Sequence, residues 1–277
     1  MSRIFLVAAL MSIVSLALII IFMFTNGLPV ILKYGFDEFL FGTTWRPTVT
    51  EPKFGLLPMI LGSMYVTLGA AFFGVPVGIL TAVFMAEYCP KWLYKILKPA
   101  ISLMAAIPSI VYGFFALQLL VPVVRDYLGG NGYSMLTAML LLGIMILPTV
   151  IELTEAAIRA VPTTYYEGSI ALGATHERSI FTVVVPAARS GVLSSMVLGI
   201  GRAIGETMAV VLIAGNQPIV PNGLLTGVRT LTTNIVLEMS YASGDHRQAL
   251  IATGVILFVF ILLINSIFIY MKEREMK

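Results

Sequence analysis

The chain has 277 residues, of which 58% are hydrophobic and 11% are charged. Soluble domains carry about 25% charged residues, so this composition excludes a soluble globular protein and indicates an all-α integral membrane protein. The formal net charge of +3 then reflects how lysine and arginine divide between the two sides of the bilayer, and we predict no nucleic-acid partner. Because Cys89 is the single cysteine and the chain has two histidines, we also predict no disulfide, metal site or cofactor.

Six segments are long enough and apolar enough to be membrane spans, since a helix needs roughly 20 apolar residues to cross the hydrocarbon core. They are residues 4–24, 56–85, 100–123, 135–158, 191–214 and 249–271. Arg3 precedes the first span, as in a signal peptide. Its apolar run is longer than a signal core and no small-residue cleavage site follows it, so we expect a retained span.

Counting lysine and arginine outside the spans predicts the orientation. With the N-terminus in the cytoplasm, the inner segments hold ten of these residues and the outer segments hold six. The positive-inside rule therefore places both termini in the cytoplasm. We predict three parts: residues 1–55, with the first span and an extracytoplasmic segment; 56–271, the main membrane domain; and 272–277, a cytoplasmic tail.

Glycine and proline positions predict how the spans pack and bend. Gly74 with Gly78, and Gly201 with Gly205, form GxxxG pairs, which allow two helices to approach closely. Pro108, like Pro122 and Pro148, indicates a bent or broken helix of the kind that transporters place around central sites.

The inner segment 159–190 is long and mixed in polarity. Pro162 is expected to end the fourth span's helix, and a short helix can follow at residues 165–171. Gly173 then permits a turn, and a second helical piece can run to Pro186. Such a hairpin is a plausible contact for a soluble partner, although the pattern alone also fits an ordinary loop.

Arg202 and Glu206 lie near the middle of the fifth predicted span. On a continuous helix, residues four apart lie on the same face, so the two charges would stack. An arginine at the bilayer centre costs roughly 2.5–3.5 kcal/mol on insertion scales, so it usually faces a bundle interior or a water-filled path. The pair is therefore predicted either to line such a path or to form a buried ion pair that braces helices.

The chain contains no G-x-x-x-x-G-K-[ST] loop that would bind the phosphates of ATP. No Ser-His-Asp or Cys-His grouping stands out either. We therefore predict that this chain has no ATPase site of its own and is not an enzyme.

Two sets of residues resemble a known family. Glu167, Gly168 and Ser169, then Gly173 and, after further residues, Pro186, resemble the EAA-x3-G-x9-I-x-L-P loop of ABC importer permeases. The chain departs from that loop at Gly168 and Ser169, where alanines are usual. Residues 201–210 (GRAIGETMAV) are similar to the C-type permease of the phosphate ABC transporter, as are residues 65–68 (YVTL), 86–88 (AEY), 107–115 (IPSIVYGFF) and 243–247 (SGDHR).

The resemblance implies a type I ABC importer permease with six transmembrane helices in a bacterial or archaeal cytoplasmic membrane. It implies phosphate as the substrate. The implied partners are a second, A-type permease, two copies of a cytoplasmic ATPase and an extracytoplasmic phosphate-binding protein. The loop around Glu167 would couple the ATPase to the spans.

Within that framework, Arg202 is the candidate for meeting the anion, and Glu206 would hold Arg202 in place and offset its charge. Thr207 and Ser109 could donate hydrogen bonds to the anion, or instead bond back to their own helices.

His246 and Arg247 could touch a binding protein, although a solvated loop is the simpler interpretation. Glu87, Glu152 and Glu155 are expected in solvated or interfacial positions. The alternatives for function are a permease for sulfate or molybdate, or a channel or carrier that works without an ATPase.

Overall fold

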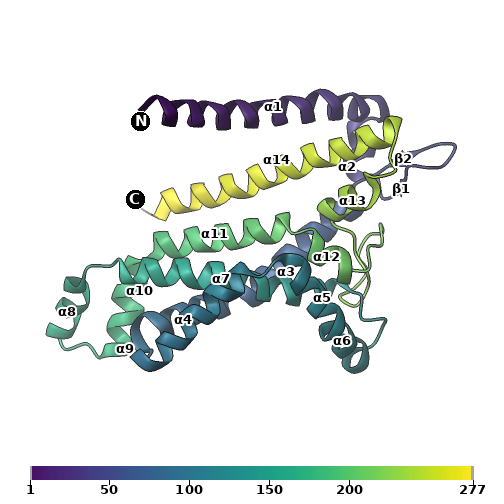
Figure 1. Cartoon of the computed structure of the whole chain (residues 1–277). Coiled ribbons are helices and arrows are strands. Elements are labelled where there is room, and N and C mark those ends of the chain that lie inside the picture. The colour runs from purple at the N-terminus through teal and green to yellow at the C-terminus, as the bar shows by residue number, and fades with distance from the viewer. Residues whose placement is uncertain (1, 276–277) are drawn as a thin grey trace. The chain divides into compact units, whose positions relative to one another are not determined.

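The structure, a computed structural model, describes residues 2–275 and the side chains of residues 4–270 (Figure 1). Five helical segments are long and apolar enough to cross a membrane: Ile4–Tyr34, Leu57–Tyr88, Ser109–Leu128, Met135–Arg159 and Gly244–Tyr270. The pair His176–Ala187 and Arg189–Gly205, bent by 68°, makes six if it crosses as one span. The predicted all-α membrane class is confirmed. Contacts divide the chain into two compact units, described separately below.

The first unit comprises residues 1–62, 216–221 and 228–260. It contains α1 (Ser2–Tyr34), α2 (Phe36–Phe41), β1 (Trp45–Arg46), β2 (Lys53–Phe54), α13 (Leu231–Glu238), the start of α3 (Leu57–Val83) and most of α14 (Gly244–Glu275). The first predicted span was too short, because α1 continues through Pro29. An interior proline costs one backbone hydrogen bond and kinks a helix without necessarily ending it in a membrane. Residues 276 and 277 of the predicted tail lie outside the described part.

The core of this unit surrounds a buried carboxylate. Trp45 and Phe54 are paired across the antiparallel hairpin of β1 and β2. The Trp45 indole donates to Glu238 at 2.9 Å, His246 Nε2 lies 2.8 Å from the same carboxylate, and Arg229 forms an ion pair with it. His246 is therefore buried beside Glu238, so the prediction that it lies in a solvated loop was wrong. A sequence pattern could not reveal this, because Glu238 and Trp45 come from distant segments.

The second unit comprises residues 63–215, 222–227 and 261–277. It contains the rest of α3 and the π-helical turn η1 (Phe84–Tyr88), then α4 (Lys91–Ala106), α5 (Ser109–Gln118), α6 (Leu120–Leu128), α7 (Met135–Arg159) and α8 (Thr163–Ala171). After these come α9 (His176–Ser179), the π-helical turn η2 (Ile180–Val184), α10 (Val185–Ala187), α11 (Arg189–Gly205) and α12 (Met208–Ile213).

Glycines bring α3 close to α7 in this unit. A methyl group added at Gly74 would lie 2.5 Å from the Gly143 carbonyl, and one added at Gly78 would lie 2.8 Å from Val150. The first GxxxG pair therefore allows close helix approach, as predicted. At Gly201 and Gly205 an added methyl group would meet no described atom within 4 Å, so the second pair does not pack against another helix of the described chain.

Candidate functional site

A row of small residues places α11 against α7. Gly191, Ser195 and Gly199 repeat every four residues, so they share one face of α11. A methyl group at Gly191 would clash with Ala157, and one at Gly199 would lie 2.9 Å from Val150, both on α7. Between them, the buried Ser195 hydroxyl lies 2.7 Å from that of Thr154. This row fixes the position of the last turn of α11, which carries Arg202.

Arg202 is half-buried, and two features stabilise its charge. Its Nη1 donates to the Thr149 hydroxyl of α7 at 3.4 Å. It also lies in the last turn of α11, where the carbonyl ends of the helix favour a cation. Thr149 was not among the predicted site residues, since a lone threonine in an apolar span has no distinguishing pattern.

The helix that carries Arg202 does not continue to residue 214 as predicted. It ends at Gly205, Glu206 has extended φ and ψ of −67° and 131°, and α12 starts at Met208. A Glu206 oxygen accepts from the Ala209 amide at 3.1 Å. The prediction that Glu206 stacks on Arg202 along one continuous helix was therefore wrong. An acidic side chain at a helix start satisfies amides that lack an intrahelical partner, which is what Glu206 does for α12.

The third predicted span is also broken. α4 ends at Ala106, and α5 starts at Ser109 after Pro108, because proline disfavours helical geometry in the residue before it. α5 packs against α12, where a methyl group at Gly113 would lie 2.8 Å from the Ala209 Cα. Half-buried Ser109 lies one turn before Gly113 on α5. Thr207 donates to the nearby Gly205 carbonyl at 3.1 Å, so its hydroxyl bonds back to the local backbone.

The segment between α7 and α11 folds as the predicted helical hairpin. Pro162 is the N-cap of α8, and α8 ends before Gly173, whose φ of +86° favours glycine. Glu167, Gly168 and Gly173 are exposed, whereas Ser169 is half-buried and receives a hydrogen bond from Ser179 at 2.9 Å. Pro186 lies within α10 and is exposed. The tip residue Leu172 is 92% exposed.

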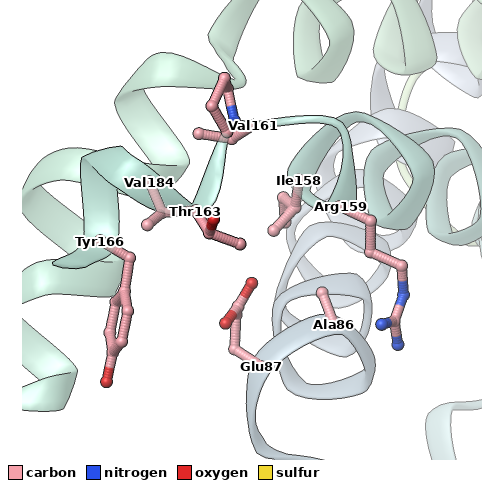
Figure 2. Close-up of a pocket in the computed structure, with 9 residues that line it drawn as sticks. Ala86, Glu87, Ile158, Arg159, Val161, Thr163, Tyr166 and Val184 are labelled. Atoms are coloured by element: carbon pink, nitrogen blue, oxygen red, sulfur yellow. The ribbon is translucent and has the colours of Figure 1, made fainter.

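Aromatic contacts join this hairpin to the rest of the second unit. The Tyr166 hydroxyl lies 2.9 Å from His176 Nδ1, and the Tyr88 ring lies edge-on to His176 at 5.0 Å between centroids. His176 is thus half-buried between two tyrosines and not an exposed loop residue. Nearby, a cavity of about 260 Å³ separates η1 and the end of α7 from α8. Figure 2 shows the Glu87 carboxylate directed toward Thr163 in this cavity.

Glu155 is buried at the end of α7 and anchors α4, whereas a solvated or interfacial position was predicted. It accepts from the Tyr94 hydroxyl at 2.7 Å, from Lys98 at 3.0 Å and from Arg159 at 2.9 Å. The hydrogen bond to Glu155, together with burial, raises the pKa of Tyr94. Burial alone would lower the pKa of Lys98, but the hydrogen bond and charge of Glu155 outweigh it and raise that pKa. One turn earlier on α7, Glu152 accepts from Ser102 of α4 at 2.7 Å.

Several named proteins resemble this chain over most of its length. The Bacillus subtilis protein YqgH, named as a probable ABC transporter permease protein, is 40% identical over 96% of this chain and 88% of its own. The phosphate transport system permease protein PstC of Haemophilus influenzae is 34% identical, covering 91% and 85% of the two chains. A protein of Methanocaldococcus jannaschii, named as a probable PstC, is 33% identical over 93% and 88%.

Solved structures share the fold. A bacterial ABC transporter involved in the import of the acidic polysaccharide alginate has a chain with a TM-score of 0.69 at 18% identity, covering 99% of this chain and 96% of that one. The inward-facing MetNI methionine ABC transporter gives 0.64 at 20% identity, over 79% and 95%. Residues 74–276 match the family described as binding-protein-dependent transport system inner membrane components. The chain therefore belongs to that family of permease subunits and has the fold of a type I ABC importer permease.

Proposed function

We propose that this permease carries inorganic phosphate inward across a bacterial or archaeal cytoplasmic membrane, driven by ATP hydrolysis on a partner chain. The observation that carries the proposal is the position of Arg202, at the end of α11 where the apolar helix is interrupted. A guanidinium is permanently charged and presents paired N–H donors that match phosphate oxygens. The PstC naming of relatives at 33% and 34% identity supports phosphate as the cargo.

Because α11 ends at Gly205, Arg202 lies beside the carbonyl end of its helix, which it would not do in a continuous helix. Glu206 leaves the helix and accepts the Ala209 amide, while Arg202 lies at the carbonyl end of α11 and donates to the Thr149 hydroxyl. Carbonyl and hydroxyl partners carry no net charge, so they leave the positive charge of Arg202 in place to attract an anion. We infer that Arg202 attracts phosphate during passage and that Glu206 shapes the break. Ser109 is proposed as a further hydrogen-bond donor along the path, and Thr207 as one that would exchange its bond to the Gly205 carbonyl for the anion.

The hairpin of α8 and α9 is the proposed contact for the ATPase. Its exposed residues include Glu167, Gly168, Gly173 and Leu172. Ser169 accepts a hydrogen bond from Ser179 of α9, and Pro186 lies in α10, which follows the hairpin. Hydrogen bonds at 2.9 Å through Ser169 and Tyr166 hold α8 to α9, so a push on α8 would move both. Movement of the hairpin would then reach α11 through η2 and α10, which follow it in the chain.

The full assembly would contain a second, A-type permease, two ATPase copies and an extracytoplasmic phosphate-binding protein, with both termini of this chain in the cytoplasm. Co-purification with an ATPase and a second permease, followed by ATP-dependent phosphate uptake in liposomes, tests this. Uptake by the purified chain alone, without ATPase, would favour a channel or carrier. Competition among phosphate, sulfate and molybdate in the same assay separates the cargoes, and preferential uptake of sulfate or molybdate would refute phosphate.

A further inference from the structure

A second cavity of about 500 Å³ lies at the end of the span Leu57–Tyr88, where η1 leads into α4. Its walls carry three cations: Lys91 and Lys95 from the first turns of α4, and Arg159 from the end of α7. Met85, Ala86 and Cys89 of the η1 region line it as well. A volume of this size falls in the range of ligand pockets, about 300–1,000 Å³.

The basic residues at this cavity outnumber the nearby acids by one: Lys91, Lys95, Lys98 and Arg159 lie near Glu87, Glu152 and Glu155. Glu155 is paired with both Lys98 and Arg159. Lys91 and Lys95 are exposed, and among the described side chains neither has an ion pair or hydrogen bond. Glu87 lines the neighbouring cavity. In Figure 2 its carboxylate turns toward Thr163, while the Arg159 guanidinium lies beyond Ala86.

Arg159 is held so that part of its guanidinium remains open to a ligand. Its Nε donates to Glu155, its Nη2 donates to the Met85 carbonyl at 2.9 Å, and its plane lies over the Tyr94 ring at 5.0 Å. Nη1 has no hydrogen-bond partner in the described part of the chain, and a guanidinium presents five donors in all. A fixed arginine beside two exposed lysines is a suitable environment for a phosphate group.

The outer face of α4 is apolar. Trp92 is 67% exposed, Ile96 60% and Leu103 69%. Their spacing of four and seven residues places them on one side of the helix, starting at the basic end and running along it. Tryptophan prefers the level of the lipid headgroups, and the apolar side chains after it can lie against acyl chains. The cavity and this face together match a molecule with an anionic head and an apolar tail.

We propose that this cavity, formed by η1, the first turns of α4 and the end of α7, binds the phosphate group of an anionic phospholipid. The lipid's acyl chains lie along the face of α4 that carries Trp92 and Ile96. The site does not involve Arg202 and is independent of which anion is transported. A free anion would satisfy the cations equally, but it would leave the adjoining apolar face without a ligand, so the lipid is the occupant we favour.

Native mass spectrometry of the full chain, purified in mild detergent, tests the proposal with added phosphatidylglycerol and phosphatidylcholine. We expect the wild type to bind phosphatidylglycerol more tightly. A lysine near an anionic lipid surface contributes about fivefold in affinity, so Lys95→Gln alone is expected to lower phosphatidylglycerol affinity by that factor. Replacing Lys91→Gln together with Lys95→Gln is expected to lower it roughly 30-fold. The pair Lys91→Arg with Lys95→Arg keeps the charge and should retain binding.

A matched control removes two other exposed cations of the same unit, Arg178→Gln with Arg189→Gln, which do not line the cavity. This control should leave phosphatidylglycerol binding unchanged. Equal binding of the two lipids would overturn the proposal, and so would an equal loss in the Lys91→Gln with Lys95→Gln variant and the Arg178→Gln with Arg189→Gln control. So would displacement of the lipid by millimolar inorganic phosphate, because the cavity would then be a site for soluble anions.

Discussion

Arg202 on α11 donates a hydrogen bond to Thr149 on α7 at 3.4 Å, and the small residues Gly191, Ser195 and Gly199 hold the two helices close enough for this contact. α11 ends three residues after Arg202, at Gly205, so the arginine lies beside the carbonyl end of its helix. The carbonyl end of the helix and the Thr149 hydroxyl thus both stabilise a cation in an apolar span. The contact makes Thr149 a positioning residue for Arg202.

The first prediction concerns the charge of Arg202. Replacing Arg202→Ala is expected to abolish phosphate uptake while the complex still assembles, because hydrogen bonds to charged groups contribute about 1.5–3 kcal/mol each and at least two would be lost. Thr149→Val keeps the charge and removes one hydrogen bond, so we expect a loss of roughly tenfold or less. Uptake in membrane vesicles measures both. Near-normal uptake by Arg202→Ala, at normal protein levels, would contradict the role in the path.

The second prediction concerns the packing of α11. In Gly199→Ala, the new methyl group would lie 2.9 Å from Val150, so α11 must shift away from α7. Overpacking of this kind costs about 1–3 kcal/mol. We expect a lower melting temperature and reduced uptake, since Arg202 follows Gly199 by one turn. Gly201→Ala is the matched control, because its methyl group meets no described atom within 4 Å. Equal melting temperatures for the two variants would show that this packing is not tight.

The third prediction concerns the turn after α8. Gly173 has a φ of +86°, where a side chain costs about 1–2 kcal/mol, so Gly173→Ala should disturb the hairpin and weaken both ATPase co-purification and uptake. Gly168→Ala is the control: Gly168 also has open space around it but is not among the residues with positive φ. It should leave both measurements unchanged. If Gly173→Ala retained a bound ATPase and full uptake, the hairpin would not be the coupling element.

The fourth prediction concerns the buried Glu155. Removing one partner of a buried ion pair costs about 3–5 kcal/mol. Here the partner cations Lys98 and Arg159 are 37% and 47% exposed and can regain water, so we expect about 2–3 kcal/mol for Glu155→Gln. Glu152→Gln, one turn away, keeps an oxygen that can accept from Ser102 and removes only the charge, so it should cost about 1 kcal/mol or less. Thermal unfolding in detergent compares the two, and an equal effect would show that the Glu155 cluster adds no more stability than Glu152 does.

Much of the fold follows from local sequence features. The spans near residues 56–85, 135–158 and 249–271 were predicted close to their observed bounds, because long apolar runs have few alternatives in a membrane. The hairpin of α8 and α9 was predicted from Pro162 and Gly173, since each residue restricts the backbone directly. The segments with Glu167 and with Arg202 indicated the family from their residues alone.

The errors fall where an apolar run is interrupted or where a charge finds a distant partner. Hydropathy sums a window of residues, so it does not register that the helix stops at Gly205 and that Glu206 bonds to the next helix. Nor does it show that Glu155 meets Tyr94 and Lys98, or that His246 meets Glu238, because a window of neighbouring residues carries no information on tertiary partners. In each case a solvated or stacked charge was predicted, and the structure shows the side chain bonded to a specific partner.

The amino-acid sequence alone identifies an all-α membrane protein that resembles an ABC importer permease, with an arginine and a glutamate inside one apolar segment. What those two residues contact follows from the folded structure. Glu206 satisfies the Ala209 amide of α12, while Arg202, at the end of α11, donates to Thr149. The reason is physical: inside a membrane every freed backbone group needs a partner, and those partners come from neighbouring helices that a linear sequence does not place.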